Sequence, residues 1–389
     1  MARILAVGGG SGGHVTPVVA VFKELRNLDA THELRFWCDK KFGEAAEDIF
    51  SRYDKDIPVE RIISGKLRRY HGMGAKQFLR PSILFPNLVD FVKIGTGFMQ
   101  SLWKLLAWRP DVIFIKGGYV CLPVGYAARL LRIPLVLHDS DAHPGLTNRL
   151  LAPFAARIGT GAPLEYYNYP PQKADYVGIP VAEEFRPYTE DERQILKHQL
   201  GFDKSKPLIV VTGGGLGATR INNAIVESRN LILKEASVLL ISGQQQYEEL
   251  EKRTKGEQNG WRLVPFVSDG MAQTLAAADL VIARAGATTL LELAALEKPT
   301  IIVPNELLTA GHQLKNAKVY QDKLAAVVVT EEQMMQPGNI LAKKALQLLN
   351  APKILTGLGK NIGKFAKPEA AKDMAKMITL VLRRQGRRK

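Results

Sequence analysis

A glycine-rich loop with a single histidine is the first feature of the sequence that could do chemistry. The motif GGGSGGH spans residues 8–14, between an apolar run and an amphipathic stretch. Backbone N–H groups in such a loop can converge on an anion, and the amino terminus of the following helix adds partial positive charge. We expect a phosphate or diphosphate here, at Gly10, Ser11, Gly12, Gly13 and His14. The alternatives are a tight turn without a ligand and a histidine that only packs at the helix start.

The loop departs from the common nucleotide-binding motifs. A Walker loop is excluded because GK[ST] does not follow, and the dinucleotide fingerprint G-x-G-x-x-G fits only loosely, with Asp39 as its one candidate ribose ligand. A second loop, TGGGLGATRIN at 212–222, includes Gly215 and repeats the strand-glycine-helix pattern. Two such loops facing each other across a cleft would hold a diphosphate and its partner from both sides. A plain turn is the alternative for the second loop as well.

Two further segments of the second half could bind a nucleotide-linked group. In RAGATTLLEL, residues 284–293, a turn of small residues opens a helix that contains Glu292. A carboxylate so placed can accept both hydroxyls of a ribose while the N–H groups of the turn face phosphate. The alternative is a solvated helix glutamate. In TAGHQLKNA, residues 309–317, His312 and Gln313 follow a glycine at another helix start, where they could also be surface residues.

Acids and histidines gather after one apolar run of the first half. The segment LVLHDSDAH, residues 135–143, brings His138, Asp139 and Asp141 just past a predicted strand. Open α/β sheets bind ligands at strand ends. These side chains could bind a divalent metal, act as a general base, or form a structural turn.

The elements that position these residues alternate between short apolar runs and helical patterns. Continuous runs such as RILAVGG, DVIFIKGG, PLIVVTGGG and DLVIARAG are typical of parallel strands covered on both faces. We therefore predict an α/β protein of two doubly wound, Rossmann-like halves. The expected domains are residues 1–178 and 179–365. By analogy with many two-domain proteins of this class, the last helix, 366–389, should pack back on the first domain.

Composition points to a folded protein with an anionic partner. The chain has 389 residues, 46% of them hydrophobic, two cysteines in apolar surroundings and a net charge of +15. No apolar run is long enough to span a membrane, so we expect a cytoplasmic protein. Residues 61–109 hold nine Lys or Arg against the single acid Asp90, interleaved with apolar residues. This pattern is typical of a peripheral membrane contact, expected at Phe78, Leu79, Arg80 and Phe85, or else of a solvated helix face. Nucleic acid is the disfavoured partner, because no nucleic-acid-binding motif accompanies the charge.

Six motifs in register resemble the MurG family of bacterial N-acetylglucosaminyltransferases, which convert lipid I to lipid II. They are GGGSGGH, GGYV, LHDSDAHPGLTNRLLA, GGGLGATRIN, RAGATTLLEL and GHQLKNA. The resemblance implies a GT-B fold with the active site between two domains, at the cytoplasmic face of the cell membrane. It also implies inverting transfer from UDP-N-acetylglucosamine to lipid I, an anionic membrane surface as a partner, and no metal or other cofactor. Another UDP-sugar transferase or a UDP-sugar epimerase is the alternative.

The resemblance also implies roles for single residues. Glu292 would bind the ribose, Ala287 and Thr288 the diphosphate and Gln313 the sugar, while Val267 and Met271 would lie at the uracil. Gly215 and Arg284 would line the same pocket. His14 would be the base, with its glycine loop at the acceptor diphosphate.

The sequence departs from the family pattern at three places. HDSD replaces the usual HEQN, which shortens a glutamate to Asp139 and exchanges an asparagine for Asp141. Base function could move to Asp141, since a carboxylate accepts a proton and an amide does not. GIPVA replaces GNPVR, and Gly215 and Leu216 replace Ser and Gln. These changes put donor affinity and sugar choice in question and leave the predicted fold unaffected.

Overall fold

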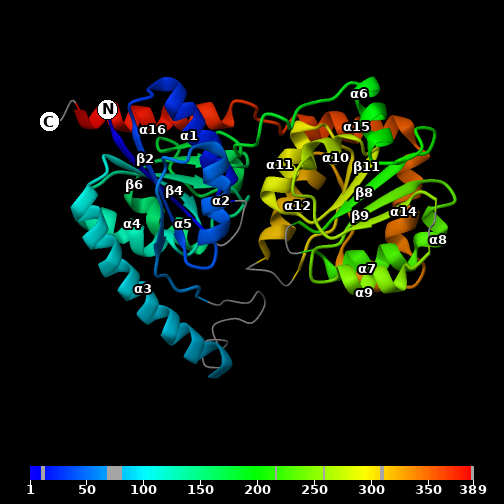
Figure 1. Ribbon diagram of the computed structural model, residues 1–389, viewed down its shortest axis with the longest axis horizontal. Coiled ribbons are helices and arrows are strands. Elements are labelled where there is room, and N and C mark those ends of the chain that lie inside the picture. The colour runs from blue at the N-terminus through cyan, green and yellow to red at the C-terminus, as the bar shows by residue number, and fades with distance from the viewer. Residues whose placement is uncertain (10–13, 68–80, 215–216, 257–258, 307–310, 387–389) are drawn as a thin grey trace. The chain divides into compact units, whose positions relative to one another are not determined.

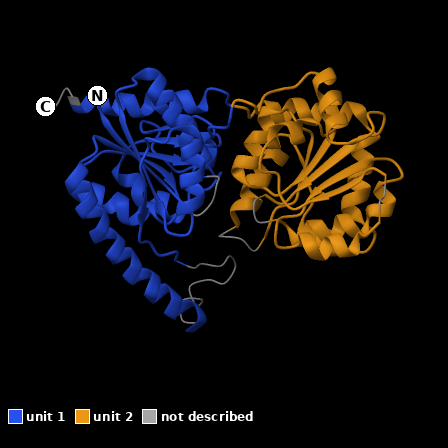
Figure 2. Ribbon diagram, in the orientation of Figure 1, with its two compact units in different colours: residues 1–182, 367–389 blue, residues 183–366 orange. Residues whose placement is uncertain are grey.

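The chain divides into two compact units. The computed structural model describes residues 1–9, 14–67, 81–214, 217–256, 259–306 and 311–386. Unit 1 comprises Met1–Ala182 and Lys367–Lys389, and unit 2 comprises Glu183–Ala366 (Figure 2). The boundary at Ala182 lies four residues beyond the division expected after residue 178.

Unit 1 is built on a parallel sheet of seven strands. The spatial order is β3-β2-β1-β4-β5-β6-β7, so the direction of winding reverses between β1 and β4. Open α/β sheets bind ligands at such a reversal, outside the carboxyl ends of the strands. The strands are β1 (Arg3–Gly8), β2 (Glu33–Asp39), β3 (Val59–Ile62), β4 (Val112–Gly117), β5 (Leu135–Asp139), β6 (Ala155–Thr160) and β7 (Ala174–Tyr176).

Helices cover both faces of this sheet (Figure 1). Side chains alternate along β1, so Ile4 and Ala6 join the core under α1, α2 and α16, while Leu5 and Val7 join the core under α3, α4 and α5. The last helix, α16, lies against α1 and so completes unit 1. The helices are α1 (Thr16–Leu28), α2 (Gly43–Tyr53), α3 (Pro81–Trp108), α4 (Cys121–Leu130), α5 (Leu146–Leu151) and α16 (Ala370–Gly386), with short turns at η3 (Ala152–Phe154) and η4 (Leu164–Tyr166).

Unit 2 repeats this architecture around a six-stranded parallel sheet. Its order, β10-β9-β8-β11-β12-β13, reverses between β8 and β11. The strands are β8 (Leu208–Thr212), β9 (Ser237–Ile241), β10 (Trp261–Val264), β11 (Leu280–Ala283), β12 (Thr300–Ile302) and β13 (Val327–Val328). The helices are α6 (Glu190–Gln199), α7 (Thr219–Glu227), α8 (Arg229–Ile232), α9 (Tyr247–Arg253), α10 (Met271–Ala276), α11 (Ala287–Ala295), α12 (His312–Asp322), α13 (Glu331–Met335), α14 (Ile340–Leu349) and α15 (Pro352–Gly363).

The predicted α/β class with two Rossmann-like halves is confirmed by these two sheets. Both are entirely parallel, and the chain winds each of them from the middle outward in both directions. In the part of the chain that the structure describes, no helix has the length and apolar character needed to cross a membrane.

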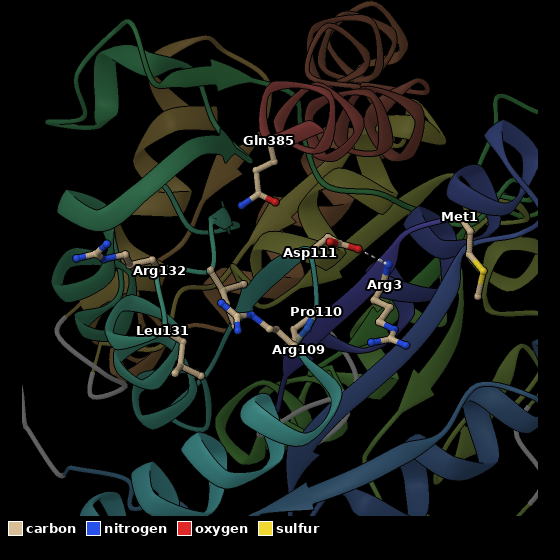
Figure 3. Close-up of a pocket in the computed structure, with 9 residues that line it drawn as sticks. Met1, Arg3, Arg109, Pro110, Asp111, Leu131, Arg132 and Gln385 are labelled. Carbon is tan, nitrogen blue, oxygen red and sulfur yellow. Dashed lines mark hydrogen bonds between the residues drawn. The ribbon is translucent and has the colours of Figure 1, made fainter. Parts of the chain in front are cut away.

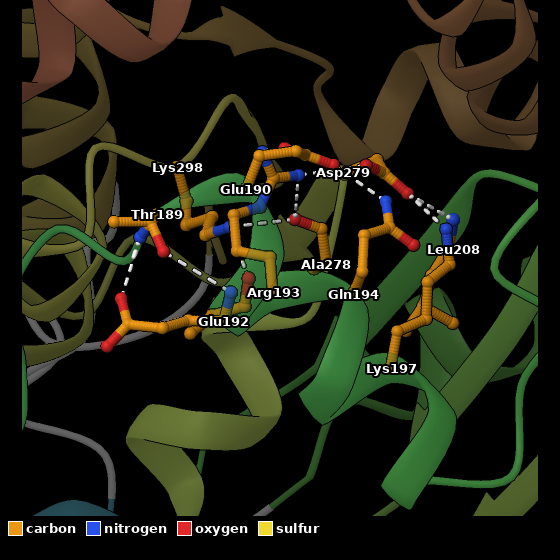
Figure 4. A network of polar contacts seen from close by, with 11 residues as sticks. Thr189, Glu190, Glu192, Arg193, Gln194, Lys197, Leu208, Ala278, Asp279 and Lys298 are labelled. Carbon is orange, nitrogen blue, oxygen red and sulfur yellow. Dashed lines mark hydrogen bonds and ion pairs between the residues drawn. The ribbon is translucent and has the colours of Figure 1, made fainter.

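A polar network joins α6 to the amino end of the second sheet (Figure 4). Asp279 is its centre: Oδ2 accepts from Lys197 Nζ at 2.9 Å and from the Leu208 N–H at 2.7 Å, and Oδ1 accepts from Arg193 at 2.8 Å. Lys197 is almost fully buried, and this carboxylate is the counter-charge of its ammonium. A buried ammonium without its partner is strongly destabilising.

Asp279→Ala should therefore lower the free energy of unfolding of unit 2 by about 3 kcal/mol, because Lys197 loses its counter-charge and Leu208 its acceptor. Urea unfolding of the whole chain measures this effect. The matched control Glu248→Ala removes an exposed carboxylate of α9 and should change the value by less than about 0.5 kcal/mol. An equal loss of unfolding free energy in the two variants would contradict the central role of Asp279 in this network.

Candidate active site

The carboxyl ends of neighbouring strands in unit 1 bring several predicted residues together. His14 follows β1, Asp139 ends β5, and Asp141 comes two residues later. His14 feels the charges of Asp141, of Asp39 at the end of β2, and of Lys116 in β4. Asp139 acts on Lys116 in the same way. The three predicted catalytic residues thus belong to one electrostatic cluster, and their catalytic roles stay a prediction.

The surroundings of His14 keep its imidazole neutral. The side chain is half-buried, and its Nδ1 atom is shielded from solvent without a hydrogen-bond partner among the described residues. Burial and the Lys116 ammonium lower the pKa of His14 to about 4, against the raising effect of Asp141 and Asp39. At neutral pH the ring is therefore in the form that can accept a proton.

Lys116 belongs to this cluster, although it is absent from the residues predicted above. It lies near the end of β4 and is only 1% exposed, and its Nζ donates a hydrogen bond to Ser140 Oγ. Burial lowers the pKa of Lys116 to about 8, while Asp141 and Asp139 oppose this shift. The signal in the sequence is a lysine at the end of an otherwise apolar strand, VIFIKGG, which surface placement does not explain.

Two tyrosines that follow η4 hold the segment after β5. Tyr169 donates its hydroxyl to Asp139 Oδ2 at 2.7 Å, and Tyr167 donates to the Asp141 carbonyl oxygen at 2.7 Å. Burial raises the pKa of both phenols, so they remain donors. His138 is fully buried, and its Nε2 is bonded to the Gly178 carbonyl at 2.7 Å, which is a structural role.

Glycines let the first loop approach the neighbouring strands. A Cβ on Gly9 would lie 2.5 Å from Asp39 Oδ2, and a Cβ on Gly118, which has φ +95°, would lie 2.4 Å from the Gly9 carbonyl oxygen. A side chain at Gly9 would displace the Asp39 carboxylate, and a side chain at Gly118 would require the backbone to shift. Other predicted residues lie outside the described part of the chain: Gly10, Ser11, Gly12, Gly13, Phe78, Leu79, Arg80 and Gly215.

The predicted donor residues of unit 2 also gather at the carboxyl ends of its strands. Val267 follows β10, Arg284 follows β11, and Gln313 follows β12 at the start of α12. Ala287 and Thr288 open α11, whose N-cap Gly286 makes no side-chain cap. The first N–H groups of that helix are therefore free of intrahelical partners. Met271 opens α10 after Gly270, which has φ +76°.

Glu292 is the most perturbed carboxylate among these residues. Burial, followed by the nearby Glu184, raises the pKa of Glu292 to about 7. No hydrogen bond or ion pair joins its carboxylate to another described residue. A half-buried carboxylate left unpaired is costly in a folded protein, and a carboxylate with so perturbed a pKa is a candidate for a functional site.

Arg284 is engaged inside unit 2. Its guanidinium donates to the Val303 carbonyl oxygen at 3.1 Å and pairs with Glu331 Oε1 at 2.6 Å. Glu331 is buried and also pairs with Arg220 in the first turn of α7. Arg284 thus braces the strand ends, and direct contact with a donor stays a prediction. Gln313 keeps its Oε1 on the Asn305 N–H at 2.9 Å, which leaves its amide nitrogen for other partners.

An exposed apolar stripe runs along α3. Its members recur at helical spacing and lie on one side of the helix: Phe85, Leu88, Val89, Val92, Met99, Trp103 and Leu106. Phe85 is 64% exposed and Trp103 76% exposed. Figure 1 shows the amino-terminal half of α3 extending beyond the rest of unit 1. Only Phe85 of this α3 stripe was among the predicted membrane residues.

A cavity of about 560 Å³ lies at the opposite end of the first sheet (Figure 3). Arg3 of β1, and Arg109 and Asp111 just before β4, form part of its wall. None of the described residues that line it was predicted, and it is remote from the strand ends where the predicted residues gather. Among the described residues, no group of three or more His, Cys, Asp or Glu could hold a metal ion.

Comparison with known proteins identifies the family. Residues 4–160 match the glycosyltransferase family 28 N-terminal domain, and residues 208–374 match its C-terminal domain. The UDP-N-acetylglucosamine–N-acetylmuramyl-(pentapeptide) pyrophosphoryl-undecaprenol N-acetylglucosamine transferase of Clostridium kluyveri is 33% identical over 86% of this chain and 88% of its own. The transferase of the same name from Caldanaerobacter subterraneus is 30% identical over 97% of this chain and 100% of its own.

A solved structure agrees with these relatives. The crystal structure of Acinetobacter baumannii MurG matches 97% of this chain and 99% of its own, with a TM-score of 0.71 and 25% identity. The two parallel sheets described above are the two halves of that shared fold. The chain therefore belongs to glycosyltransferase family 28 and, within it, to the MurG family of N-acetylglucosamine transferases with the GT-B fold.

Proposed function

We propose that this chain transfers N-acetylglucosamine from UDP-N-acetylglucosamine to the 4-hydroxyl of the N-acetylmuramic acid of lipid I, giving lipid II for peptidoglycan synthesis. The observation that carries the proposal is the unpaired, half-buried Glu292 carboxylate beside the open amino terminus of α11. Such a carboxylate can accept two ribose hydroxyls, and the helix N–H groups can face the diphosphate. The names of the relatives, which align over most of the chain, support the same conclusion.

The donor is assigned to unit 2. Ala287 and Thr288 offer N–H groups to the diphosphate, Gln313 offers its amide nitrogen to the sugar, and Val267 and Met271 lie near the uracil. Gly215 and Arg284 complete this pocket in the proposal. No metal cofactor is part of the proposed reaction.

The acceptor is assigned to unit 1, with its diphosphate at the loop of residues 8–14. The 4-hydroxyl attacks the anomeric carbon and gives up its proton to a base, while the bond to the UDP oxygen breaks and its electrons leave with UDP. His14 is neutral at physiological pH and can take this proton, and Asp141 is the second candidate. Helix N–H groups stabilise the negative charge that develops on the departing diphosphate.

The α3 stripe is assigned to the membrane. Lipid I carries an undecaprenyl chain, so an enzyme that uses it must work at a bilayer surface. Apolar side chains that insert shallowly, beside basic residues that attract anionic headgroups, give peripheral binding. In this proposal the chain is a peripheral protein at the cytoplasmic face of the membrane.

The decisive experiment measures transfer of labelled N-acetylglucosamine from UDP-N-acetylglucosamine to lipid I, with other UDP-sugars as competitors. We expect labelled lipid II and release of UDP. Conversion of the UDP-sugar to its epimer without an acceptor would instead assign the chain to the epimerases. Transfer to soluble sugars, with no transfer to lipid I, would mean that the acceptor is a soluble sugar.

Glu292→Ala should raise the KM for UDP-N-acetylglucosamine, because the ribose hydroxyls lose the carboxylate that accepts their hydrogen bonds. In the wild type the ionised carboxylate binds the ribose, and it forms as the pH rises through about 7. The KM should therefore fall about tenfold between pH 6 and pH 8. Glu292→Gln, of nearly the same volume, should lose this pH dependence. A KM that neither variant changes removes Glu292 from the ribose site.

His14→Ala or Asp141→Asn should lower kcat by about 10²-fold, because the attacking hydroxyl loses its base. Steady-state kinetics with lipid I measure this loss. His198→Ala, which changes an exposed histidine of α6, serves as the control and should leave kcat unaltered. Near-normal kcat in both site variants would assign the base elsewhere.

Serine substitution of Phe85, Leu88 and Val92 together should weaken binding to phosphatidylglycerol vesicles more than tenfold, since each side chain loses apolar area to bury. Activity on a water-soluble acceptor analogue should stay within about twofold, because these residues are exposed. The control pair Met335→Ser and Ile354→Ser removes exposed apolar residues of unit 2 and should leave vesicle binding intact. Loss of both properties in the triple variant would mean that the stripe is needed for folding.

A further inference from the structure

A buried lysine lies beside Gly8, the residue that ends β1. Lys116 is among the largest fully buried side chains of the protein, and its ammonium donates to Ser140 Oγ in the segment after β5. Burying an ammonium costs several kcal/mol unless polar partners and opposite charges surround it. Asp141 and Asp139 provide such charges and, at neutral pH, keep Lys116 mostly protonated. Lys116 lies near the end of a strand and beside the candidate base His14. Because its burial is costly, we expect the ammonium to have a function.

Gly8 lies between Lys116 and His14. A Cβ on Gly8 would lie 3.4 Å from Lys116 Cβ, 3.5 Å from His14 Cβ and 3.0 Å from the His14 carbonyl oxygen. Gly117 follows Lys116 in β4, and a Cβ on Gly117 would lie 3.4 Å from His14 Cε1. The imidazole therefore packs against the backbone that immediately follows Lys116.

Charged groups face His14 from each strand end around it. Asp39 acts from β2, Lys116 from β4, and Asp141 from the segment after β5, while His138 of β5 lies near enough to feel His14 in turn. Burial of the ring is the largest influence on the pKa of His14 and favours the neutral imidazole, and the Lys116 ammonium adds to this effect. The two carboxylates and a hydrogen bond to the Lys116 backbone favour the protonated form. Without the ammonium, the two carboxylates would be the only charges of this set acting on the ring.

We propose that Lys116 is a positioning residue of the transfer reaction, whose ammonium, held by Ser140, keeps the His14 imidazole unprotonated and ready to act as base. This inference rests on the proposed function, and it adds a residue for which no role has been assigned. The neutral ring takes the proton of the acceptor's 4-hydroxyl as the new bond to the anomeric carbon forms and the bond to UDP breaks. Lys116 itself touches neither substrate.

The physical reason is like-charge repulsion in a partly desolvated site. A positive charge that acts on an imidazole disfavours its protonated form, and nearby charges shift a pKa by about one unit or more. The shift favours the form that a general base needs, because a protonated imidazole has no free lone pair for the incoming proton. The carboxylates next to the loop can then be retained without protonating His14.

The test follows the titration of His14 directly, by NMR of protein labelled at histidine Cε1, over pH 5 to 8. His14→Gln identifies the signal. In the wild type the His14 signal should keep its neutral position down to pH 5. Lys116→Gln retains a donor for Ser140 and drops the charge, so the His14 midpoint should rise by more than about one pH unit and come into this range. Lys116→Arg restores the charge and should restore the wild-type behaviour.

The pH profile of kcat/KM gives the second readout. The acid limb of Lys116→Gln should move upward together with the NMR midpoint, while Lys55→Met, which removes an exposed lysine of unit 1, should match the wild type. Lys116→Met is the second neutral variant if Lys116→Gln does not fold, and circular dichroism checks both. A His14 signal that stays neutral down to pH 5 in a folded neutral variant overturns the proposal.

The two claims fail separately. A raised His14 midpoint in a protein that transfers no sugar to lipid I supports the Lys116 effect on the imidazole and rejects the proposed function. A raised midpoint together with an unmoved acid limb, in an enzyme that makes lipid II, rejects the positioning role of Lys116 for the base.

Discussion

Both units depend on parallel strands that are covered by helices on both faces. The central strands β1, β4, β8 and β11 are buried, and each has a reversal of winding beside it. No polar side chain can serve a ligand from the middle of such a strand, since nothing but apolar packing surrounds it. Chemistry is therefore confined to the carboxyl ends. His14 and Lys116 lie at such ends, and Glu292 lies in α11, the helix that follows β11.

The position of these ionisable groups near the strand ends also determines how strongly their charges interact. Groups crowded at the edge of a sheet are partly withdrawn from water, so their charges act on one another strongly. His14 is pushed toward its neutral form, Glu292 toward its protonated form, and Lys116 loses part of its basicity. In unit 1 the acids and bases compensate one another within the protein. In unit 2 the Glu292 carboxylate has no such compensation among the described residues, and a ribose at this position stays a prediction.

The sequence predicts positions at strand ends better than it predicts the partners found there. His14 and Glu292 could be identified because glycines and small residues mark the turn before each of them. Lys116 could not be assigned, because a lysine after an apolar run is buried only if acids from another strand reach it, and that depends on tertiary packing. The same holds for Arg284, whose partner Glu331 follows a different strand. Along α3, composition indicates an apolar segment, but only the packing of α4 decides which side remains exposed.

The place of α16 has a consequence for how the protein is made. Met374, Ile378 and Val381 are part of the core between the first sheet and α1, yet they lie at the far end of the chain. All of unit 2 is synthesised before them, so unit 2 has its complete sequence while unit 1 still lacks one wall of its core. Domains generally fold as units during synthesis, the first one earliest. Here the order is reversed: unit 1, which begins the chain, has its complete core only after α16 has been synthesised.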